Sequence, residues 1–201
     1  HRVHRRQRQM CIRDRDYGKP GNYVARQVSR WSKQYRASET DNIEAMNNLI
    51  EWLPKNIPDD DETTIVHGDY RLDNMILRNN EVIGILDWEL STLGHPIADF
   101  SYHCLSWRTQ EAFWDEAKLK ELGIPSEKEY MEMYCKYSGK DLSKNWEFYM
   151  AFNMFKIAGI LQGILGRVRD GTAASKHAEE RGNMVFPLSQ AAWETIEDNF
   201  L

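Results

Sequence analysis

Apolar residues recur every three to four positions along most of this 201-residue chain, which predicts a mainly helical fold. The clearest case is segment 23–35, where Val24, Val28 and Trp31 share one helix face. Capping residues and Pro or Gly stop signals delimit the other helices. The same pattern predicts helices at 41–53, 96–107, 126–137, 143–168 and 174–200, the last broken near Pro187.

Apolar runs of a different kind predict three short strands between the second and third helices. Segment 63–66 is β-branched, and segments 75–77 and 81–86 flank Asn79-Asn80, a pair typical of hairpin turns. The sequence therefore predicts an α+β fold in which a small β-hairpin is set among helices.

Small and polar residues refine two of the predicted helices. Ser126 and Glu129 have the spacing of a capping box, and Gly139 is a stop signal for the helix that they begin. Three glycines also fall inside segment 143–168, where close helix packing is the better explanation. They are Gly159, Gly163 and Gly166.

The ends of the strands carry the polar residues that indicate a function. His67-Gly68-Asp69 follows the first strand. Asn74 comes five residues after Asp69, and Asp87 follows the third strand. In protein kinases an Asp five residues before an Asn orients the acceptor, and a second Asp holds Mg²⁺. Because carboxylate and amide oxygens suit Mg²⁺, the spacing predicts a phosphoryl-transfer site with Asp69 as base and Asn74 and Asp87 as metal ligands.

Each of these residues also has an ordinary structural explanation when it is taken alone. His-Gly-Asp is a frequent turn sequence, because Gly permits positive φ and Asp bonds its own backbone. Asp87 could belong to a turn at the end of a strand. The combination of strands, turn and spaced polar residues favours the catalytic interpretation.

Four segments resemble one family of enzymes. Segment 66–74, VHGDYRLDN, resembles the catalytic loop of the aminoglycoside phosphotransferase and choline kinase superfamily. Segments 86–99, 17–23 and 155–163 are similar to the kinase-like domain fused to some acyl-CoA dehydrogenases. The resemblance covers roughly residues 16 to 200. It implies a protein-kinase-like C-terminal lobe, mostly helical with a small catalytic hairpin, that uses ATP and Mg²⁺.

The resemblance also implies roles for individual residues. Asp69 is the expected catalytic base, and Asn74 and Asp87 are the expected Mg²⁺ ligands. Asp99 is expected to be a buried brace for the catalytic loop. His67 is expected to be a second brace, which we favour over a role in proton transfer.

Other residues are candidates for binding the two substrates. Ile76 and Leu86 would form the floor of the adenine pocket, although apolar strand residues are core by default. Candidates for the acceptor side are Arg71, Glu89, Lys156 and Arg167, each of which could instead be a solvated or snorkelling side chain.

The acceptor itself stays open at this point. The likeness to domains fused to acyl-CoA dehydrogenases implies a hydroxylated acyl thioester such as a hydroxyacyl-CoA, and an acyl-CoA dehydrogenase as a possible partner. An aminoglycoside would need a more acidic cleft.

The front of the chain departs from the pattern of a kinase. A glycine-rich strand pair, a strand Lys and its helix Glu partner are all missing from the sequence. We therefore expect that the N-terminal lobe is missing and that this fragment alone is inactive. Residues 1–15 hold six Arg and resemble a sequencing-library scar, so we expect an artefactual tail at 1–15 and the kinase-like lobe at 16–201. A nuclear signal or a nucleic-acid-binding arm is the alternative.

Charge and composition narrow the choice of partners. The tail holds six of 26 basic and one of 31 acidic residues, so the remainder has 20 basic and 30 acidic residues. A net charge near −10 argues against nucleic acid and anionic membranes as partners. No stretch is expected to approach the length and apolar composition of a membrane span. Three cysteines do not suggest a disulfide framework, and we expect a cytoplasmic protein with reduced thiols.

Three functions remain in competition. The leading one is an ATP- and Mg²⁺-dependent kinase that phosphorylates a hydroxyl of a small molecule. The second is a non-catalytic module that binds an acyl thioester or a partner, which would not need Asp69, Asn74 and Asp87 together. The third is a metal-dependent phosphohydrolase, which would usually gather more His and Asp ligands.

Overall fold

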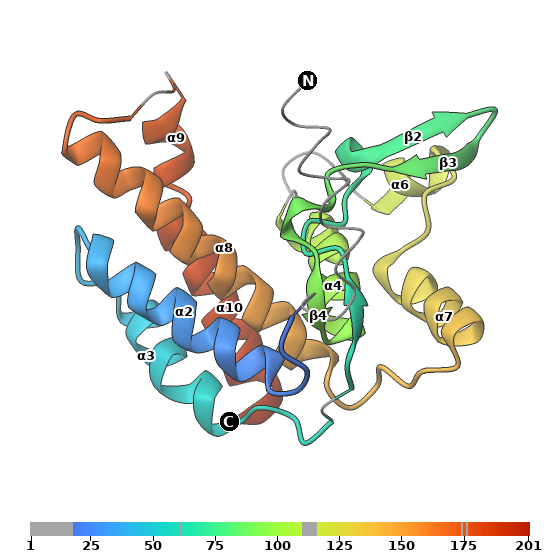
Figure 1. Ribbon diagram of the computed structural model, residues 1–201, viewed down its shortest axis with the longest axis horizontal. Coiled ribbons are helices and arrows are strands. Elements are labelled where there is room, and N and C mark those ends of the chain that lie inside the picture. Colours follow the sequence, from blue (N-terminus) through green and yellow to red (C-terminus); the bar gives the residue numbers. More distant parts are fainter. Residues whose placement is uncertain (1–17, 61, 110–115, 174, 176) are drawn as a thin grey trace.

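A long helix, α8 (Trp146–Arg169), forms the axis of a helical body that also contains α2 (Tyr23–Ser38), α3 (Glu44–Trp52) and α10 (Val185–Phe200) (Figure 1). The helices α2 and α10 pack on α8, and α3 packs on α10. The computed structural model describes residues 18–60, 62–109, 116–173, 175 and 177–201.

The glycines of α8 allow α2 to approach closely. A Cβ atom on Gly159 would lie 3.5 Å from the carbonyl oxygen of Trp31, and one on Gly166 would lie 3.3 Å from the Cβ of Ser38. Both neighbours belong to α2. The prediction that these glycines serve helix packing is confirmed.

The core of the body lies between α8 and its neighbours and consists of aromatic and aliphatic side chains. The apolar face predicted for α2 is buried, which confirms the helical periodicity. Five of the fully buried large residues are Tyr35, Met46, Leu49, Tyr149 and Phe155.

The prediction that no stretch approaches a membrane span is wrong by the measure of length and composition. Among the described residues, α8 is long and apolar enough to cross a bilayer, and 61% of its apolar window is buried inside the protein. This burial is typical of the central helix of a globular core, which is apolar all round because other helices surround it.

Two small antiparallel sheets lie beside the helical body. Strands β2 (Met75–Arg78) and β3 (Glu81–Ile85) form the predicted hairpin, and both turn residues, Asn79 and Asn80, have positive φ. Strand β1 (Thr64–Val66) pairs with β4 (Thr92–Gly94), which the sequence analysis did not predict. Short 3-10 turns occur at Leu53–Lys55, Leu72–Asn74 and Trp88–Leu90.

Four further helices follow β4, and the predicted helix 96–107 is in fact two of them. They are α4 (Pro96–Cys104), α5 (Ser106–Thr109), α6 (Glu116–Glu121) and α7 (Glu127–Ser138). The capping box that begins α7 is confirmed, since Ser126 and Glu129 exchange hydrogen bonds. Gly139 ends α7 in the left-handed conformation, as predicted.

The break predicted near Pro187 is present, but it lies before that residue and the proline does not cause it. The structure separates α9 (Ala178–Gly182) from α10 at residues 183 and 184, and Pro187 lies in the first turn of α10. A proline is tolerated there because the first amide groups of a helix have no intrahelical acceptor. Residue 174 and the tail 1–15 lie outside the described residues, so the origin of the tail stays a prediction.

One ion cluster ties α5, α7 and α8 together. The guanidinium of Arg108 donates to Glu127 at 2.6 Å and to Glu147 at 2.9 Å, and the indole of Trp146 donates to Glu127 at 2.7 Å. Burial alone would lower the pKa of Arg108, but the bonds to the two carboxylates raise it above its ordinary value. The cluster fixes α7 against the helical body.

Candidate active site

Hydrogen bonds to α4 hold the backbone of the loop that follows β1. Asp99 accepts the backbone N–H of His67 at 2.7 Å and that of Gly68 at 2.8 Å. Gly68 has φ +82°, and a Cβ atom there would lie 2.6 Å from the carbonyl oxygen of Leu90. Since L side chains rarely adopt this φ and the nearest atom belongs to the backbone, only glycine fits.

His67 connects the loop to the end of the hairpin. Its side chain is 3% exposed, and its Nε2 lies 2.7 Å from the carbonyl oxygen of Leu86. Its Nδ1 accepts the N–H of Asp69 at 3.3 Å, which assigns the proton to Nε2. Trp88 packs on the same ring, with 4.8 Å between centroids. Both ring nitrogens are therefore used in holding the backbone.

The carboxylate of Asp69 has a hydrogen-bond donor on each oxygen. The hydroxyl of Tyr102 donates to Oδ1 at 2.8 Å, and the Nδ2 of Asn74 donates to Oδ2 at 3.0 Å. The same amide also donates to the carbonyl oxygen of Asp69 at 2.8 Å. Tyr102 was missed in the sequence, although it lies three residues after Asp99 and so on a neighbouring part of the same helix face.

Asn74 and Asp87 both lie at the open end of the hairpin, next to the paired strands. The N–H of Leu86 donates to the carbonyl oxygen of Asn74 at 2.8 Å and so closes the two strands beside Asp87. Asp87 is exposed, has φ 61° and ψ 52°, and makes no side-chain cap bond to the 3-10 turn that follows. Left-handed backbone in a residue other than glycine is uncommon and clusters at functional sites.

These two residues have side-chain oxygen atoms of the kind that bind a magnesium ion. Because the Nδ2 of Asn74 is engaged with Asp69, its Oδ1 is the atom left for a cation. Oδ1 of Asn74 and the carboxylate of Asp87 are hard oxygen ligands. The described residues contain no group of three or more His, Cys, Asp or Glu side chains placed to hold a metal. A magnesium ion here would take its remaining ligands from phosphates and water, as is usual for this ion.

The candidate substrate residues fall in different places. Lys156 lies under the loop, with its Nζ 3.4 Å from the carbonyl oxygen of Gly68, and burial lowers its pKa. Arg71 pairs with Asp73 at 2.5 Å on the surface of the loop. Glu89 is exposed in the 3-10 turn after Asp87, and Arg167 is exposed near the end of α8.

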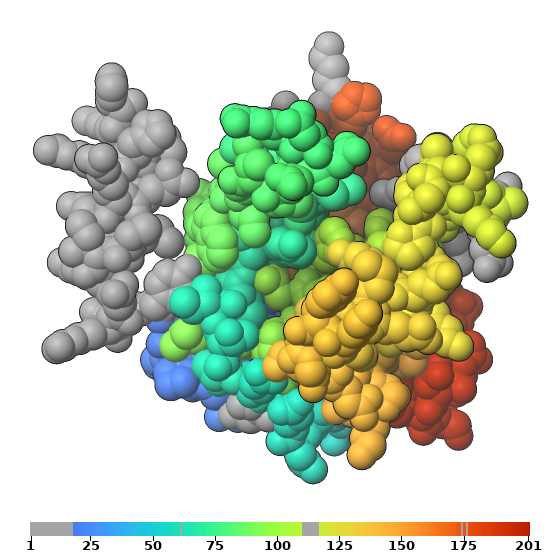
Figure 2. Space-filling view, turned by 90° about the vertical axis from the view of Figure 1, so that its right-hand side faces the viewer, coloured from blue at the N-terminus to red at the C-terminus, as the bar shows by residue number. Residues whose placement is uncertain are grey.

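The hairpin presents its apolar residues to solvent. Ile76 is 42% exposed and Leu86 is 50% exposed, and Leu77 and Val82 are more than half exposed. Figure 2 shows the hairpin, in green, at the top of one face of the molecule. The two residues expected to contact adenine therefore belong to an open apolar surface.

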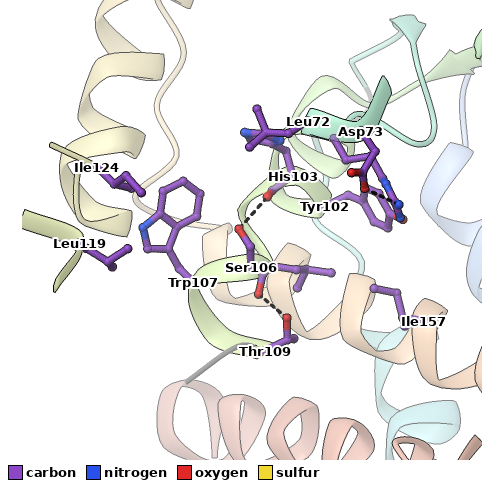
Figure 3. A pocket seen from close by; sticks show the side chains of 12 residues that line it. Leu72, Asp73, Tyr102, His103, Ser106, Trp107, Thr109, Leu119, Ile124 and Ile157 are labelled. Carbon is purple, nitrogen blue, oxygen red and sulfur yellow. Dashed lines mark hydrogen bonds and ion pairs between the residues drawn. The ribbon is translucent and has the colours of Figure 1, made fainter. Parts of the chain in front are cut away.

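A cavity of about 550 Å³ lies beside the loop that follows β1 (Figure 3). Its polar lining includes Arg71, Asp73, Tyr102 and His103, and burial lowers the pKa of His103. Its apolar lining consists of Leu72, Leu105, Trp107, Leu119, Ile124 and Ile157. Tyr102 belongs both to this cavity and to the hydrogen bonds of Asp69, so the cavity opens next to the expected base.

Comparison with known proteins identifies related chains. The profile described as the Phosphotransferase enzyme family matches residues 1–134. Acyl-CoA dehydrogenase family member 10 of Mus musculus is 45% identical over 89% of this chain, and family member 11 of Homo sapiens is 40% identical over 92%. A crystal structure from Ralstonia eutropha, of a protein provisionally assigned as an aminoglycoside phosphotransferase, is 50% identical, covers 92% of this chain and superimposes with a TM-score of 0.84.

The matches cover only part of the related proteins. The chain spans 17% of the length of the mouse protein, 24% of the human protein and 58% of the bacterial one. The structural similarity confirms the predicted kinase-like fold, and the relatives confirm the predicted branch of the superfamily. The roles of individual site residues are not tested by these matches and stay predictions.

Proposed function

Because the chain belongs to the phosphotransferase enzyme family, we propose that it forms part of an ATP- and Mg²⁺-dependent kinase that phosphorylates a hydroxyl of a small molecule. The observation that carries this proposal is the arrangement of Asp69, Asn74 and Asp87 on one braced loop and hairpin end. Phosphoryl transfer depends mainly on positioning and charge stabilisation, which such a rigid constellation supplies.

Each residue of the site has a defined part in the proposed reaction. Asp69 accepts the proton of the attacking hydroxyl while the hydroxyl oxygen bonds to the γ-phosphorus, the bond from that phosphorus to the bridging oxygen breaks and ADP leaves. Asn74 and Asp87 would hold Mg²⁺, which when bound neutralises charge on the phosphate oxygens. Asp99 and His67 keep the loop backbone in place. Ile76 and Leu86 would contact the adenine ring.

For the acceptor we propose a hydroxylated acyl thioester, such as a hydroxyacyl-CoA. The cavity next to Asp69 is mostly apolar, and the one carboxylate in its described lining, Asp73, is already paired with Arg71. A polycationic aminoglycoside would need several free carboxylates to replace its hydration. The relatives' names support an acyl-CoA context and an acyl-CoA dehydrogenase as partner. Arg71, Glu89 and Lys156 stay candidates for contacts on the acceptor side.

The proposal is tested with the complete protein and a panel of acceptors. ADP release is measured with ATP, Mg²⁺ and hydroxyacyl-CoA thioesters, choline-like alcohols or aminoglycosides. We expect turnover with the thioesters and a loss of at least about 100-fold in kcat for Asp69→Asn. The control is Asp198→Asn, the same change at an exposed position of α10.

Two outcomes would contradict the proposal. Full activity of Asp69→Asn would remove Asp69 as the base. Tight thioester binding without any turnover would favour the non-catalytic binding module, for which the apolar cavity is the supporting observation. We further expect the present chain by itself to release no ADP, because the sequence contains no glycine-rich strand pair to cover the phosphates.

A further inference from the structure

We propose that Tyr102 is a positioning residue of this site, which fixes the carboxylate of Asp69 in the orientation that receives the proton of the acceptor. This role rests on the proposed kinase function. The observation behind it is the hydrogen bond of 2.8 Å from the Tyr102 hydroxyl to the Oδ1 of Asp69.

The carboxylate of Asp69 has a fixed orientation because two hydrogen-bond donors hold it. The torsion that turns a carboxyl group about its Cβ–Cγ bond has broad minima, so one donor on one oxygen restricts it poorly. Asn74 holds Oδ2 and Tyr102 holds Oδ1. With one donor on each oxygen the plane of the carboxylate is fixed. Each oxygen still has a lone pair for the acceptor, because an ionised carboxylate accepts about four hydrogen bonds.

The same helix holds both the backbone and the side chain of the loop. Asp99 on α4 binds the amide groups of His67 and Gly68, and Tyr102 follows it by three residues. Residues three apart on a helix are neighbours on its surface. The helix α4 therefore fixes the loop through two residues. Asp99 holds the backbone of the loop, and Tyr102 holds the side chain of Asp69.

The ring of Tyr102 is itself held in place by Lys156. The ammonium of Lys156 on α8 lies 4.7 Å from the centroid of the Tyr102 ring, within the range of a cation–π contact, and also reaches the carbonyl oxygen of Gly68. This contact uses the face of the ring and leaves the hydroxyl to Asp69. A substitution that keeps the ring therefore keeps the support from Lys156.

The hydroxyl acts as a donor at every pH at which the enzyme would work. Burial, together with the bond to Asp69 and its charge, raises the pKa of Tyr102 to about 12. A phenol with this pKa stays protonated near neutrality, so it orients Asp69 and does not take a proton from it. This distinguishes a positioning role from that of a second base.

The experiment compares Tyr102→Phe with wild type in the complete protein. The variant keeps the ring beside the cavity and removes only the hydroxyl. We expect kcat to fall by about 10- to 100-fold, since small misplacements of a catalytic group have effects of this size, while the KM for ATP changes by less than about twofold. The control is Tyr134→Phe, the same change on α7. The ring of Tyr134 stacks on that of Phe100, with 3.8 Å between the ring centroids. The control variant should keep the wild-type kcat.

Two further measurements separate positioning from a general structural role. Incorporation of 3-fluorotyrosine at position 102 restores a donor hydroxyl and should return kcat to within about threefold of wild type. In the background of Asp69→Asn, Tyr102→Phe should change the residual rate by less than about twofold, because residues that act as a unit are not additive. A further loss equal to that in the wild-type background would show that Tyr102 acts independently of Asp69 and would overturn the inference.

The inference and the proposed function can fail separately. If wild type is active and Tyr102→Phe has the same kcat, the positioning role is wrong and the kinase function stands. If no acceptor supports turnover, crystal structures of both proteins still decide the point. A turned Asp69 carboxylate in Tyr102→Phe supports the positioning of this side chain by Tyr102, and an unchanged orientation rejects it.

Discussion

The helical body and the hairpin of β2 and β3 use apolar residues in opposite ways. In the body, side chains such as Phe155 and Leu49 are completely buried between helices. In the hairpin, Leu77 is 60% exposed and Val82 is 51% exposed. The body is therefore stabilised by packing. The loop and hairpin end are held by a few polar contacts from His67, Asn74 and Asp99, so changes there should affect chemistry more than stability.

The largest difference is expected between two truncations of apolar side chains. Phe155→Ala removes a fully buried ring from α8 and should lower the free energy of unfolding by about 3–5 kcal/mol. Leu77→Ala on the hairpin should change it by no more than about 0.5 kcal/mol. Denaturant unfolding of both variants measures the two values. Equal losses would show that the hairpin is packed like the body.

A second comparison uses two glycines with the same backbone conformation. Gly68 and Gly139 have φ of 82° and 72°, but a Cβ atom would meet the carbonyl of Leu90 at Gly68 and open space at Gly139. Each change to Ala should lower the free energy of unfolding by about 1–2 kcal/mol, because an L residue is disfavoured in the left-handed conformation. Only Gly68→Ala should also displace the loop and abolish turnover. The free energies of unfolding and the kcat of both variants, measured in the complete protein, test this. An active Gly68→Ala would show that the loop position is not critical.

A third prediction concerns metal binding at the hairpin end. Asp87→Ala in the complete protein removes a proposed magnesium ligand and should weaken binding of Mg²⁺·ATP by about tenfold or more, which corresponds to about 1.4 kcal/mol. Glu81→Ala removes an exposed carboxylate from the same hairpin and is the control. Calorimetric titration of ATP with and without Mg²⁺ gives the affinities. Unchanged magnesium dependence in Asp87→Ala would exclude it from the metal site.

The smallest expected effect is a dependence of stability on pH that arises from His95, which precedes α4 and stacks on Tyr149 of α8. Burial lowers the pKa of His95 below its ordinary value of 6.5, although the nearby carboxylates of Asp60 and Glu62 work against this and Lys140 acts with it. Below pH 6.5 the unfolded chain binds the proton more readily, so the free energy of unfolding should fall as the pH drops through this range and level off above it. Unfolding at several pH values measures the slope.

His95→Gln serves as the comparison for this slope. The variant cannot titrate, so its stability should vary less between pH 5 and 7 than that of wild type. The same slope in both proteins would assign the effect to other groups, among them His103, whose pKa burial also lowers.

Features that depend on neighbouring residues in the sequence could be predicted correctly. The capping box of Ser126 and Glu129, the turn at Asn79-Asn80 and the apolar face of α2 all rest on local geometry, and all are present. The spacing of the polar residues at the strand ends likewise places them around one loop. Local signals suffice because periodicity and turn chemistry act over a few residues.

Features that depend on distant residues were missed. Strand β4 has only three residues and exists because it pairs with β1, about thirty residues earlier. The cluster of Arg108, Glu127 and Glu147 brings together charges that look like solvated surface residues in the sequence. Nothing in the sequence marks Tyr102 as a partner of Asp69, which lies 33 residues earlier. Tertiary contacts decide these cases, and a single sequence does not show which residues meet.

The cavity beside the loop has a consequence for inhibition. Tyr102 borders this cavity, and its hydroxyl bonds to Asp69. A small molecule that filled the cavity and drew this hydroxyl to itself would release the Asp69 carboxylate without entering the nucleotide site. In the proposed kinase, such a compound would inhibit phosphoryl transfer without competing with ATP. Its selectivity among related proteins would depend on the residues that line the cavity.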